Sequence, residues 1–274
     1  MSNPEATLIQ SIAYGICAAI ALVFVIRQKK GLSPTQTCKG INVSAFKATD
    51  VLCVSLLVLY YLLYIPGSGS DKPAPVAIPS AKILLLSNIT AIIPALAVFL
   101  RLRQDYLKKI PGWTGHNSFL NLLVYPVCGI ILVYGFISTL EYSGFNNWIK
   151  SAFDITSGQN VVNFLKQGSL SVQICVSVSA LLLAPLCEEC IFRGYLYPVL
   201  KKYTGFIPAI LFCSFFFACI HASGLALLPL VFLGIILILL YEKTKTLWAP
   251  IIVHFLFNLT TILAHFLGQG NLPS

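Results

Sequence analysis

The sequence predicts an all-α protein, a polytopic transmembrane helix bundle with about eight spans, and three observations predict it. The first is composition: the 274 residues are 57% hydrophobic and 10% charged, with a mean hydropathy of +0.85. An average soluble domain has about 25% charged and about 45–50% apolar residues. A soluble chain of this length could not bury so much apolar surface, because even a domain of about 300 residues leaves about a quarter of its chain surface in water. The composition therefore excludes a water-soluble globular enzyme and a disordered chain.

The second observation is the set of apolar runs along the chain. A helix needs about 17–25 mostly apolar residues to cross the hydrocarbon of a bilayer. Eight runs meet this requirement: 7–26, 50–66, 81–100, 119–139, 168–187, 205–222, 225–241 and 248–267. The third run begins near Lys82, whose long side chain can reach the headgroups. The first run is not predicted to be a cleavable signal, because the segment before it carries Glu5 and no Lys or Arg.

The third observation is the distribution of Lys and Arg, which gives the chain a net charge of +9. Short cytoplasmic loops collect Lys and Arg. With the N-terminus outside, thirteen of the eighteen basic residues fall in the inner segments 27–49, 101–118, 201–204 and 242–247. Only four fall in outer segments: Lys72, Lys82, Lys150 and Lys166. The asymmetry predicts that both termini face outside, and it accounts for the positive charge without nucleic acid.

The segments between the spans contain fewer signals. Residues 66–80 are rich in Pro, Gly and Ser and are predicted to be a loop. Residues 140–167 form the longest outer segment, and their Trp148 and Phe153 predict that part of it lies along the membrane interface. The nine cysteines fall mostly in apolar runs and predict no disulfide framework. Cys187 and Cys190 form a C-x-x-C, but no second cysteine pair or thioredoxin-like βαβ pattern supports a redox or zinc site there.

Ionisable side chains inside apolar runs are costly, so each one is a candidate functional residue. The first cluster lies in Ala184-Pro-Leu-Cys-Glu-Glu-Cys-Ile-Phe-Arg-Gly194 and holds two adjacent carboxylates. On a helix, Glu189 and Arg193 are four residues apart, lie on one face and can pair. Glu188 points about 100° away from that face and is left free, which suits a general acid or base. The alternative is a helix end that reaches the headgroups and carries an ordinary ion pair.

Two further clusters follow along the chain. The segment 217–221 places His221 near the end of a span, where an interfacial histidine is the alternative interpretation. His254 and Asn258 are four residues apart, so the imidazole and the amide lie side by side on one helix face. The alternative for this pair is hydrogen bonding between spans. The remaining histidines, His116 and His265, are predicted to be solvated.

One shared pocket explains all three clusters together, because Glu188, His221 and His254 follow one another at intervals of 33 residues. The inventory is a carboxylate, two imidazoles and an amide, with no Ser or Cys nucleophile beside a base. It suits water activation by the carboxylate and one imidazole, with the other imidazole and the amide as hydrogen-bond donors to an oxyanion. This chemistry predicts hydrolysis of an amide or ester within the membrane. Straight helices would place the two histidines at different depths, so the prediction requires a tilted, broken or bent helix, such as one long bent helix over residues 168–200.

The three motifs together resemble the CAAX protease and bacteriocin-processing family, also called the Abi family, whose eukaryotic relative is the Ras-converting CAAX endoprotease. The elements that carry the resemblance are A-P-x-x-E-E-x-x-x-R-G at 184–194, F-x-x-x-H at 217–221 and H-x-x-x-N at 254–258. The run from Tyr241 to His254 also resembles the stretch that leads into the last motif of the family. The resemblance covers roughly residues 170–260.

The resemblance implies an intramembrane glutamic endopeptidase, a hydrolase that needs no metal or other cofactor. Its implied catalytic residues are Glu188 and His221, which would activate water, and His254 and Asn258, which would form the oxyanion hole. Its implied supporting or substrate-binding residues are Glu189, Arg193 and Phe217. The expected partners are the lipid bilayer and a membrane-associated protein or peptide substrate, as in CAAX-type, surface-protein or bacteriocin processing, and no nucleic acid is expected.

Within this single bundle we expect N-terminal transmembrane helices without an assigned role (1–165) and a catalytic core (166–274). The expected location is the cell (inner) membrane of a bacterium or the endoplasmic reticulum of a eukaryote. Two alternatives stay open. One is a zinc-dependent membrane protease, since two His and a Glu can hold zinc, although the chain has no H-E-x-x-H. The other is a non-catalytic immunity or scaffold protein; a carrier is disfavoured because the polar residues gather in one half of the chain.

Overall fold

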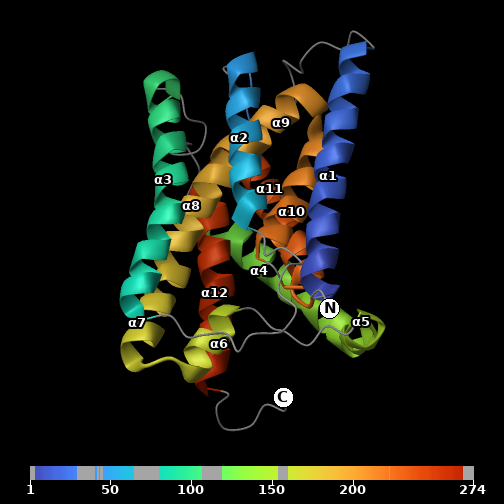
Figure 1. Ribbon diagram of the computed structural model, residues 1–274. Helices are drawn as coiled ribbons and strands as arrows, with labels where there is room; N and C mark the ends of the chain where they lie inside the picture. Colours follow the sequence, from blue (N-terminus) through green and yellow to red (C-terminus); the bar gives the residue numbers. More distant parts are fainter. Residues whose placement is uncertain are drawn as a thin grey trace.

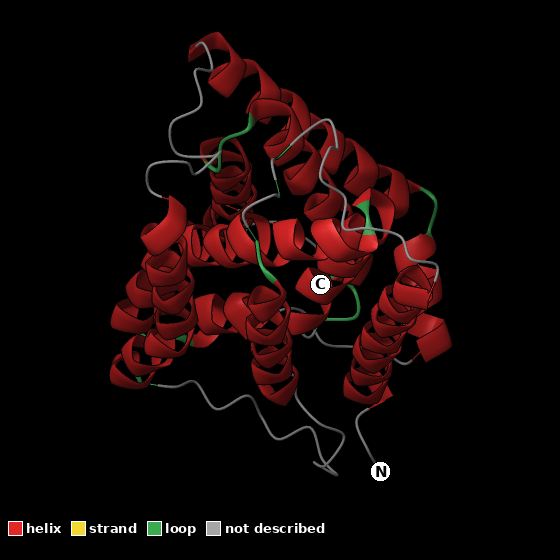
Figure 2. Cartoon of the chain, turned by 90° about the horizontal axis from the view of Figure 1, so that it is seen from above, coloured by secondary structure: helices red, strands yellow, loops and turns green. Residues whose placement is uncertain are grey.

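The computed structural model describes residues 4–29, 41, 43, 46–64, 80–106, 119–153, 160–221 and 223–267. The described part is built of helices and contains no strand, which confirms the all-α prediction (Figure 2). The helices that stand alone as single long rods are α1 (Pro4–Lys29), α2 (Ala48–Tyr64), α3 (Ala81–Tyr106), α4 (Phe119–Tyr142), α10 (Phe206–Ile220), α11 (Leu227–Thr244) and α12 (Trp248–Leu267) (Figure 1). All of them coincide with predicted apolar runs.

The fifth predicted run belongs to a longer helix than expected. It was predicted to end at 187, before the charged cluster, but the helix continues unbroken from Leu170 to Thr204, over 35 residues. Its parts are α7 (Leu170–Val178), η1 (Ser179–Leu183), α8 (Ala184–Ile191), η2 (Phe192–Leu196) and α9 (Tyr197–Thr204), of which η1 and η2 are π-helical. The glutamates therefore lie in the middle of a helix and not at its end. This helix corresponds to the long one considered over residues 168–200.

The lengths and hydropathies of the helices identify a membrane protein. Among the described residues, three helical stretches are long and apolar enough to cross a bilayer: Leu122–Tyr142, Leu170–Thr204 and Leu227–Thr244. Four shorter apolar helices accompany them, at Ser11–Arg27, Ala48–Leu62, Phe206–Ile220 and Trp248–Ala264. The chain is therefore an all-α membrane helix bundle, and the number of spans stays a prediction.

The core of the bundle lies around the second half of the long helix. All residues of η2 and more than half of those in α9, α10 and α11 are buried, and α10 packs against α11, α9 and α1. The helices of the N-terminal half cover this core: α1 lies on α10, α3 on α8 and α4 on α11. Many of their outward side chains are exposed and apolar, such as Leu22, Leu56 and Leu86, as expected of surfaces that face lipid.

Two backbone positions make the sharp corners at one end of the bundle. Gly205, between α9 and α10, has φ of 93°, a value that L side chains rarely adopt. Lys245 ends α11 in the left-handed conformation with φ of 57°. Both corners are short, so α9 and α10, and likewise α11 and α12, are neighbours along the chain and in space.

A buried cluster around Glu242 ties these corners together. The Glu242 carboxylate accepts hydrogen bonds from Lys201 Nζ (2.6 Å), the Tyr197 hydroxyl (2.6 Å) and the Ile41 backbone N–H (2.9 Å). Lys245 Nζ lies 3.8 Å from its other oxygen, and burial lowers the pKa of Lys245. These partners come from α9, the turn after α11 and the segment before α2. The Glu242 cluster therefore holds these segments to α11 at that end of the bundle.

The opposite end carries two short amphipathic helices within the predicted outer segment 140–167. They are α5 (Phe145–Phe153) and α6 (Asn160–Gln167). On α5, Trp148 is 58% exposed, and on α6, Leu165 is fully buried and its carbonyl accepts a bond from Gln173 of α7. Figure 1 shows both helices at the lower end of the bundle, with α6 beside α7 and α5 at the end of α4 on the other side.

Several sequence-based predictions concern residues outside the described part. They include most of the predicted loop 66–80, Cys38 and His116, and the side chains of Phe153 and His265. The eight cysteines that the structure describes are all free thiols, including Cys187 and Cys190. The proposed division at residue 165 stays a prediction.

Candidate active site

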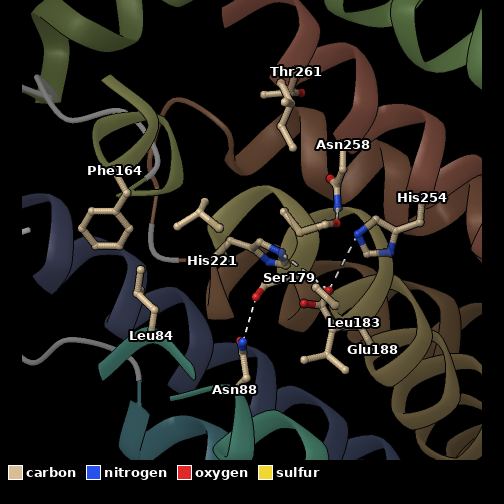
Figure 3. Close-up of a pocket in the computed structure, with 14 residues that line it drawn as sticks. Leu84, Asn88, Phe164, Ser179, Leu183, Glu188, His221, His254, Asn258 and Thr261 are labelled. Carbon is tan, nitrogen blue, oxygen red and sulfur yellow. Dashed lines mark hydrogen bonds and ion pairs between the residues drawn. The ribbon is translucent and has the colours of Figure 1, made fainter. Parts of the chain in front are cut away.

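The glutamate, the two histidines and the asparagine singled out in the sequence line one cavity of about 260 Å³. The remaining lining comes from α3, α6, α7, η1, α8 and α12, and most of it is apolar: Leu84, Asn88, Phe164, Val176, Ser179, Ala180, Leu183, Ala184, Thr261 and Ile262. Figure 3 shows Glu188 between His221 and His254, with Phe164 and Leu84 on the far side of the cavity. The long helix, α10 and α12 thus converge on a single pocket.

Glu188 faces both imidazoles without bonding either one. Its Oε2 lies 3.7 Å from Nε2 of His221 and 3.9 Å from Nε2 of His254. These separations are too long for direct hydrogen bonds but suit a small third molecule that bridges the groups. The same Oε2 is buried and has no hydrogen-bond partner among the described residues. A carboxylate oxygen that is withdrawn from solvent, unbonded and flanked by two imidazoles is typical of a reactive group.

In both imidazoles, the hydrogen-bond partner of Nδ1 determines which ring nitrogen carries the proton. His221 Nδ1 lies 2.7 Å from the Phe217 carbonyl, and His254 Nδ1 lies 2.9 Å from Glu189 Oε1. A carbonyl and a carboxylate only accept, so in both rings Nδ1 carries the proton. The neutral form of each ring therefore presents the lone pair of Nε2 to Glu188 and the cavity.

Glu189 is the buried anchor behind the pocket. Its Oε1 accepts hydrogen bonds from Arg193 Nη1 and from His254, both at 2.9 Å. Glu189 and Arg193 are 0% and 1% exposed, so the predicted ion pair is present and completely enclosed. The Arg193 guanidinium also stacks 4.6 Å from the Phe217 ring centre and donates to the Gly234 carbonyl. On the buried side of the cavity, Glu189 therefore holds the His254 imidazole by a hydrogen bond. On the cavity side, Glu188 Oε2 stays unbonded among the described residues.

The two π-helical segments have a common cause, since each ends just before a proline. Pro185 and Pro198 lack the N–H of an α-helical turn, and their rings would clash with the carbonyl four residues earlier. In the first segment Ala184 N–H therefore bonds Ser179 O, five residues back. The next bond of that pattern would join Pro185 to the Ala180 carbonyl, and proline cannot donate it. Asn258 donates its Nδ2 to that carbonyl at 2.7 Å instead.

The depth conflict between the two histidines is resolved by the corners of the bundle. His221 follows the 15-residue α10, which is about 22 Å long, whereas His254 comes only about 9 Å after the start of α12. Figure 1 shows α9 at the upper end of the bundle and α12 in its lower half. The start of α10 therefore lies closer to the upper end of the bundle than the start of α12 does. Because more residues separate His221 from the start of its helix than separate His254 from the start of α12, the two histidines lie at a similar depth.

The predicted supporting residues lie behind the cavity wall. Glu189, Arg193 and Phe217 do not line the cavity, and each is at most 1% exposed. Phe217 packs its ring edge to face on His254 at 5.7 Å and tilted on His221 at 4.7 Å. Their position suits support of the imidazoles more than direct contact with a substrate.

Sequence reasoning missed the polar groups that α3 and η1 contribute. Asn88 Nδ2 donates to Ser179 Oγ at 2.7 Å, and both residues line the cavity (Figure 3). Asn88 is a polar residue inside an apolar run, which is a signal for an interhelical bond. The Ala180 carbonyl gave no signal, because its exposure depends on the π-helical geometry.

The described part of the chain contains no preformed metal site. None of its groups of three or more His, Cys, Asp or Glu side chains is arranged to hold an ion. The two imidazoles and Glu188 are the nearest approach to such a group.

The fold and the pocket together define a class, that of a helical membrane protein whose bundle encloses a cavity lined by a carboxylate and two imidazoles. Residues 170–260 match the family model described as type II CAAX prenyl endopeptidase Rce1-like, and this match confirms the resemblance to the CAAX protease family. The "Putative membrane peptidase YdiL" of Bacillus subtilis (strain 168) is 23% identical over 219 residues, which cover 78% of this chain and 84% of that protein. No solved structure matches. These findings support a membrane peptidase, a hydrolase of Rce1-like type.

Proposed function

We propose that this protein is an intramembrane endopeptidase in which Glu188 and His221 activate a water molecule for attack on a peptide bond. The single observation that carries the proposal is the buried, unbonded Oε2 of Glu188, which faces Nε2 of His221 at 3.7 Å and of His254 at 3.9 Å. A water held between the carboxylate and an imidazole would lose its proton to one of them as it attacks the scissile carbonyl. The same group would then protonate the leaving amine.

His254 and Asn258 are the proposed donors to the oxyanion. With Nδ1–H bonded to Glu189, His254 can donate from Nε2 only as the imidazolium. Asn258 Nδ2 has two hydrogens, and the Ala180 carbonyl takes one of them. The other is available to the cavity. In a site shielded from water, such donors stabilise developing charge more strongly than they would in solution.

Glu189, Arg193 and Phe217 are proposed to act as positioning residues. Glu189 bonds His254, and Phe217 packs on both imidazoles. Arg193 acts through these two, because it bonds Glu189 and lies over the Phe217 ring. The substrate is proposed to be a membrane-associated protein or peptide, cleaved in CAAX-type, surface-protein or bacteriocin processing. The proposed location is the cell membrane of a bacterium or the endoplasmic reticulum of a eukaryote.

A comparison of membrane proteomes tests this function. Cells that produce the wild-type chain should contain new peptide termini in membrane proteins, and cells that produce Glu188→Gln at an equal level should lack them. Glu141→Gln serves as the matched control, since Glu141 is exposed at the end of α4 and does not line the cavity. Identical termini in wild type and Glu188→Gln would reject the peptidase and favour an immunity or scaffold role.

Chelation separates the glutamic from the zinc-dependent mechanism. Cleavage by the purified chain should continue at an unchanged rate after prolonged dialysis against a strong chelator, because water activation is assigned to protein side chains alone. Activity that falls on dialysis and returns with added zinc would establish the metal-dependent alternative.

A further inference from the structure

An apolar cavity of about 400 Å³ lies between α1 and α2, apart from the cavity that holds Glu188. Its volume is typical of pockets that bind small molecules, about 300–1,000 Å³. Helices α9 and α10 form its floor, because α1 and α2 both pack on them and contact each other little. We call this cavity the α1–α2 groove, and its lining includes Ile20, Phe24, Val54, Val58, Leu200 and Phe212.

The α1–α2 groove offers little polarity and opens toward the bilayer. Its two aliphatic hydroxyls, on Ser55 and Thr204, donate to carbonyls of their own helices. Val25 on its α1 wall and Leu52 beside its α2 wall are exposed, as expected of surfaces that face lipid. Along α1 the lining extends over residues 17–25, about 12 Å of helix. One leaflet supplies about 15 Å of a hydrocarbon core about 30 Å thick, so the groove suits an aliphatic chain of a single leaflet.

A cation lies at one end of the α1–α2 groove. Ile20, Phe24 and Arg27 are spaced four and three residues apart, so Arg27 continues the face of α1 that lines the groove. Its Nη1 lies 3.4 Å from the position that a Cβ on Gly205 would occupy, and Gly205 directly follows Thr204 of the lining. The Nε of Arg27 is buried and has no hydrogen-bond partner among the described residues. A buried donor without an acceptor is costly, so Arg27 calls for an oxygen that the described part of the chain does not supply.

We propose that the α1–α2 groove binds an anionic phospholipid of the bilayer, with an acyl chain between α1 and α2 and the phosphate on Arg27. Basic pockets between transmembrane helices bind anionic headgroups, and the planar guanidinium matches the oxygens of a phosphate. Lys201 and Lys202 of the same corner are engaged by Glu242 and by the Phe46 carbonyl, so the phosphate contact is assigned to Arg27.

The bound lipid would act as a structural ligand. It would fill the space between α1 and α2 and fasten both helices to α9 and α10. Helix α9 continues the long helix that carries Glu188, and α10 leads to His221. The lipid therefore stabilises two of the elements that build the pocket, and the proposal does not depend on the peptidase function.

Thermal unfolding and native mass spectrometry of the full chain in detergent test the proposal. The probes are dioleoyl phosphatidylglycerol, dioleoyl phosphatidylcholine with the same chains, and glycerol phosphate without chains. Phosphatidylglycerol should raise the unfolding temperature more than phosphatidylcholine does, because a ligand that binds only the folded state stabilises it. Glycerol phosphate should have no effect. Equal shifts with the two lipids, or a shift with glycerol phosphate as large as that with phosphatidylglycerol, would overturn the proposal.

Two pairs of variants assign the headgroup and the chain. Arg27→Gln should lower the affinity for phosphatidylglycerol about tenfold, the loss expected for one charge-assisted hydrogen bond. Its control is Lys243→Gln, exposed in the last turn of α11 and outside the groove. Ala21→Trp, on the α1 wall, should fill the groove and weaken both lipids. Its control is Leu22→Trp, on an exposed residue that does not line the groove.

The outcomes separate the lipid from other occupants. A preference for phosphatidylglycerol that persists in Arg27→Gln would overturn the proposal, as would equal lipid binding by Ala21→Trp and Leu22→Trp. A wild-type dimer that becomes monomeric in Ala21→Trp, as measured by size-exclusion chromatography with light scattering, would place a second copy in the groove and overturn it too. Unfolding without added lipid shows that each variant is folded. If Ala21→Trp does not fold, the comparison of Arg27→Gln with Lys243→Gln decides alone.

Discussion

Two buried clusters of polar residues stabilise this bundle, and they differ in how completely their polar atoms are hydrogen-bonded. Around Glu242, both carboxylate oxygens are engaged, by Lys201, Tyr197 and the Ile41 backbone. Around the pocket, three buried side-chain atoms have no hydrogen bond among the described residues: Glu188 Oε2, Glu189 Oε2 and Arg193 Nε. Buried polar atoms are normally bonded, and exceptions gather where chemistry occurs. The first cluster is organised for structure, while the second leaves an oxygen available for a reaction.

The clusters also differ in their surroundings. The Glu242 cluster is packed among helix ends and a backbone segment, and none of its members lines the pocket. Glu188 lies on the wall of a cavity of about 260 Å³. Space beside an unbonded carboxylate is what distinguishes a candidate active site from an equally buried structural ion pair.

Among substitutions around the pocket, removal of Glu189 is expected to lower the stability of the folded protein most. Glu189→Ala leaves Arg193 buried without a counter-ion and His254 without its acceptor, and breaking a buried pair in this way costs about 3–5 kcal/mol of folding free energy. The folded fraction after detergent extraction, followed by size-exclusion chromatography and thermal unfolding, should fall sharply. Glu189→Gln keeps an acceptor and should lose less. A stable Glu189→Ala protein would show that the Arg193 charge is balanced elsewhere.

The Glu242 cluster should respond equally strongly to loss of its buried cation. Lys201→Met leaves the Glu242 carboxylate without the Nζ at 2.6 Å, with an expected loss of about 3–5 kcal/mol. Lys245→Met is the matched control, because Lys245 is 38% exposed and 3.8 Å away, and such pairs contribute less than about 1 kcal/mol. Thermal unfolding in detergent measures both variants. Equal shifts for the two would contradict the hierarchy of partners within the cluster.

Asn258→Ala tests the pocket through its effect on catalysis. It removes a proposed oxyanion donor, which typically lowers kcat by about 10²–10³-fold, or roughly 3–4 kcal/mol of transition-state stabilisation. KM should change little, because the bond strengthens only as charge develops. Steady-state kinetics on folded protein of matched thermal stability decide. A large rise in KM at constant kcat would make Asn258 a substrate-binding residue.

Gly234→Ala should have the smallest of these effects on stability and turnover. Gly234 lies where α10 packs against α11, and its carbonyl accepts a hydrogen bond from Arg193. A Cβ at this position would lie 2.9 Å from Cα of Ser214 on α10, so α10 and α11 would have to separate. Overpacking of this kind costs about 1–3 kcal/mol. Gly234→Ala should therefore lower the unfolding temperature, and should lower kcat as well because Gly234 O holds Arg193. Unchanged stability would show that the crossing has room to adjust.

The sequence predicted the fold class well because hydropathy dominates in a membrane, and every predicted apolar run lies on a helix. It failed at residue 187, where the charged cluster resembled a helix end. The helix continues because Arg193 pairs with Glu189 inside the bundle and His254 hydrogen-bonds the same carboxylate. The second contact joins segments 65 residues apart, and no local pattern contains it.

The site was predicted in part for a related reason. Glu188, His221 and His254 were found because ionisable groups are rare in apolar runs, and the Glu189–Arg193 pair because helical spacing is local. A polar residue in an apolar run signals a bond between helices, but the partners of Asn258 and Asn88, the Ala180 carbonyl and Ser179, could not be identified. The first depends on the π-helical turn before Pro185, and the second on the way in which α3 packs against the long helix.

The central claim, that Glu188 performs chemistry while Glu242 maintains structure, is tested most directly by one paired measurement. Glu188→Gln and Glu242→Gln are purified in a membrane mimetic, and turnover of a peptide that spans a Glu188-dependent cleavage site is measured per folded molecule, together with thermal unfolding. Glu188→Gln should lose turnover at an unchanged unfolding temperature, whereas Glu242→Gln should unfold at a lower temperature and keep its turnover per folded molecule. Turnover that persists in Glu188→Gln, or that falls only in proportion to lost folded protein, would contradict the claim.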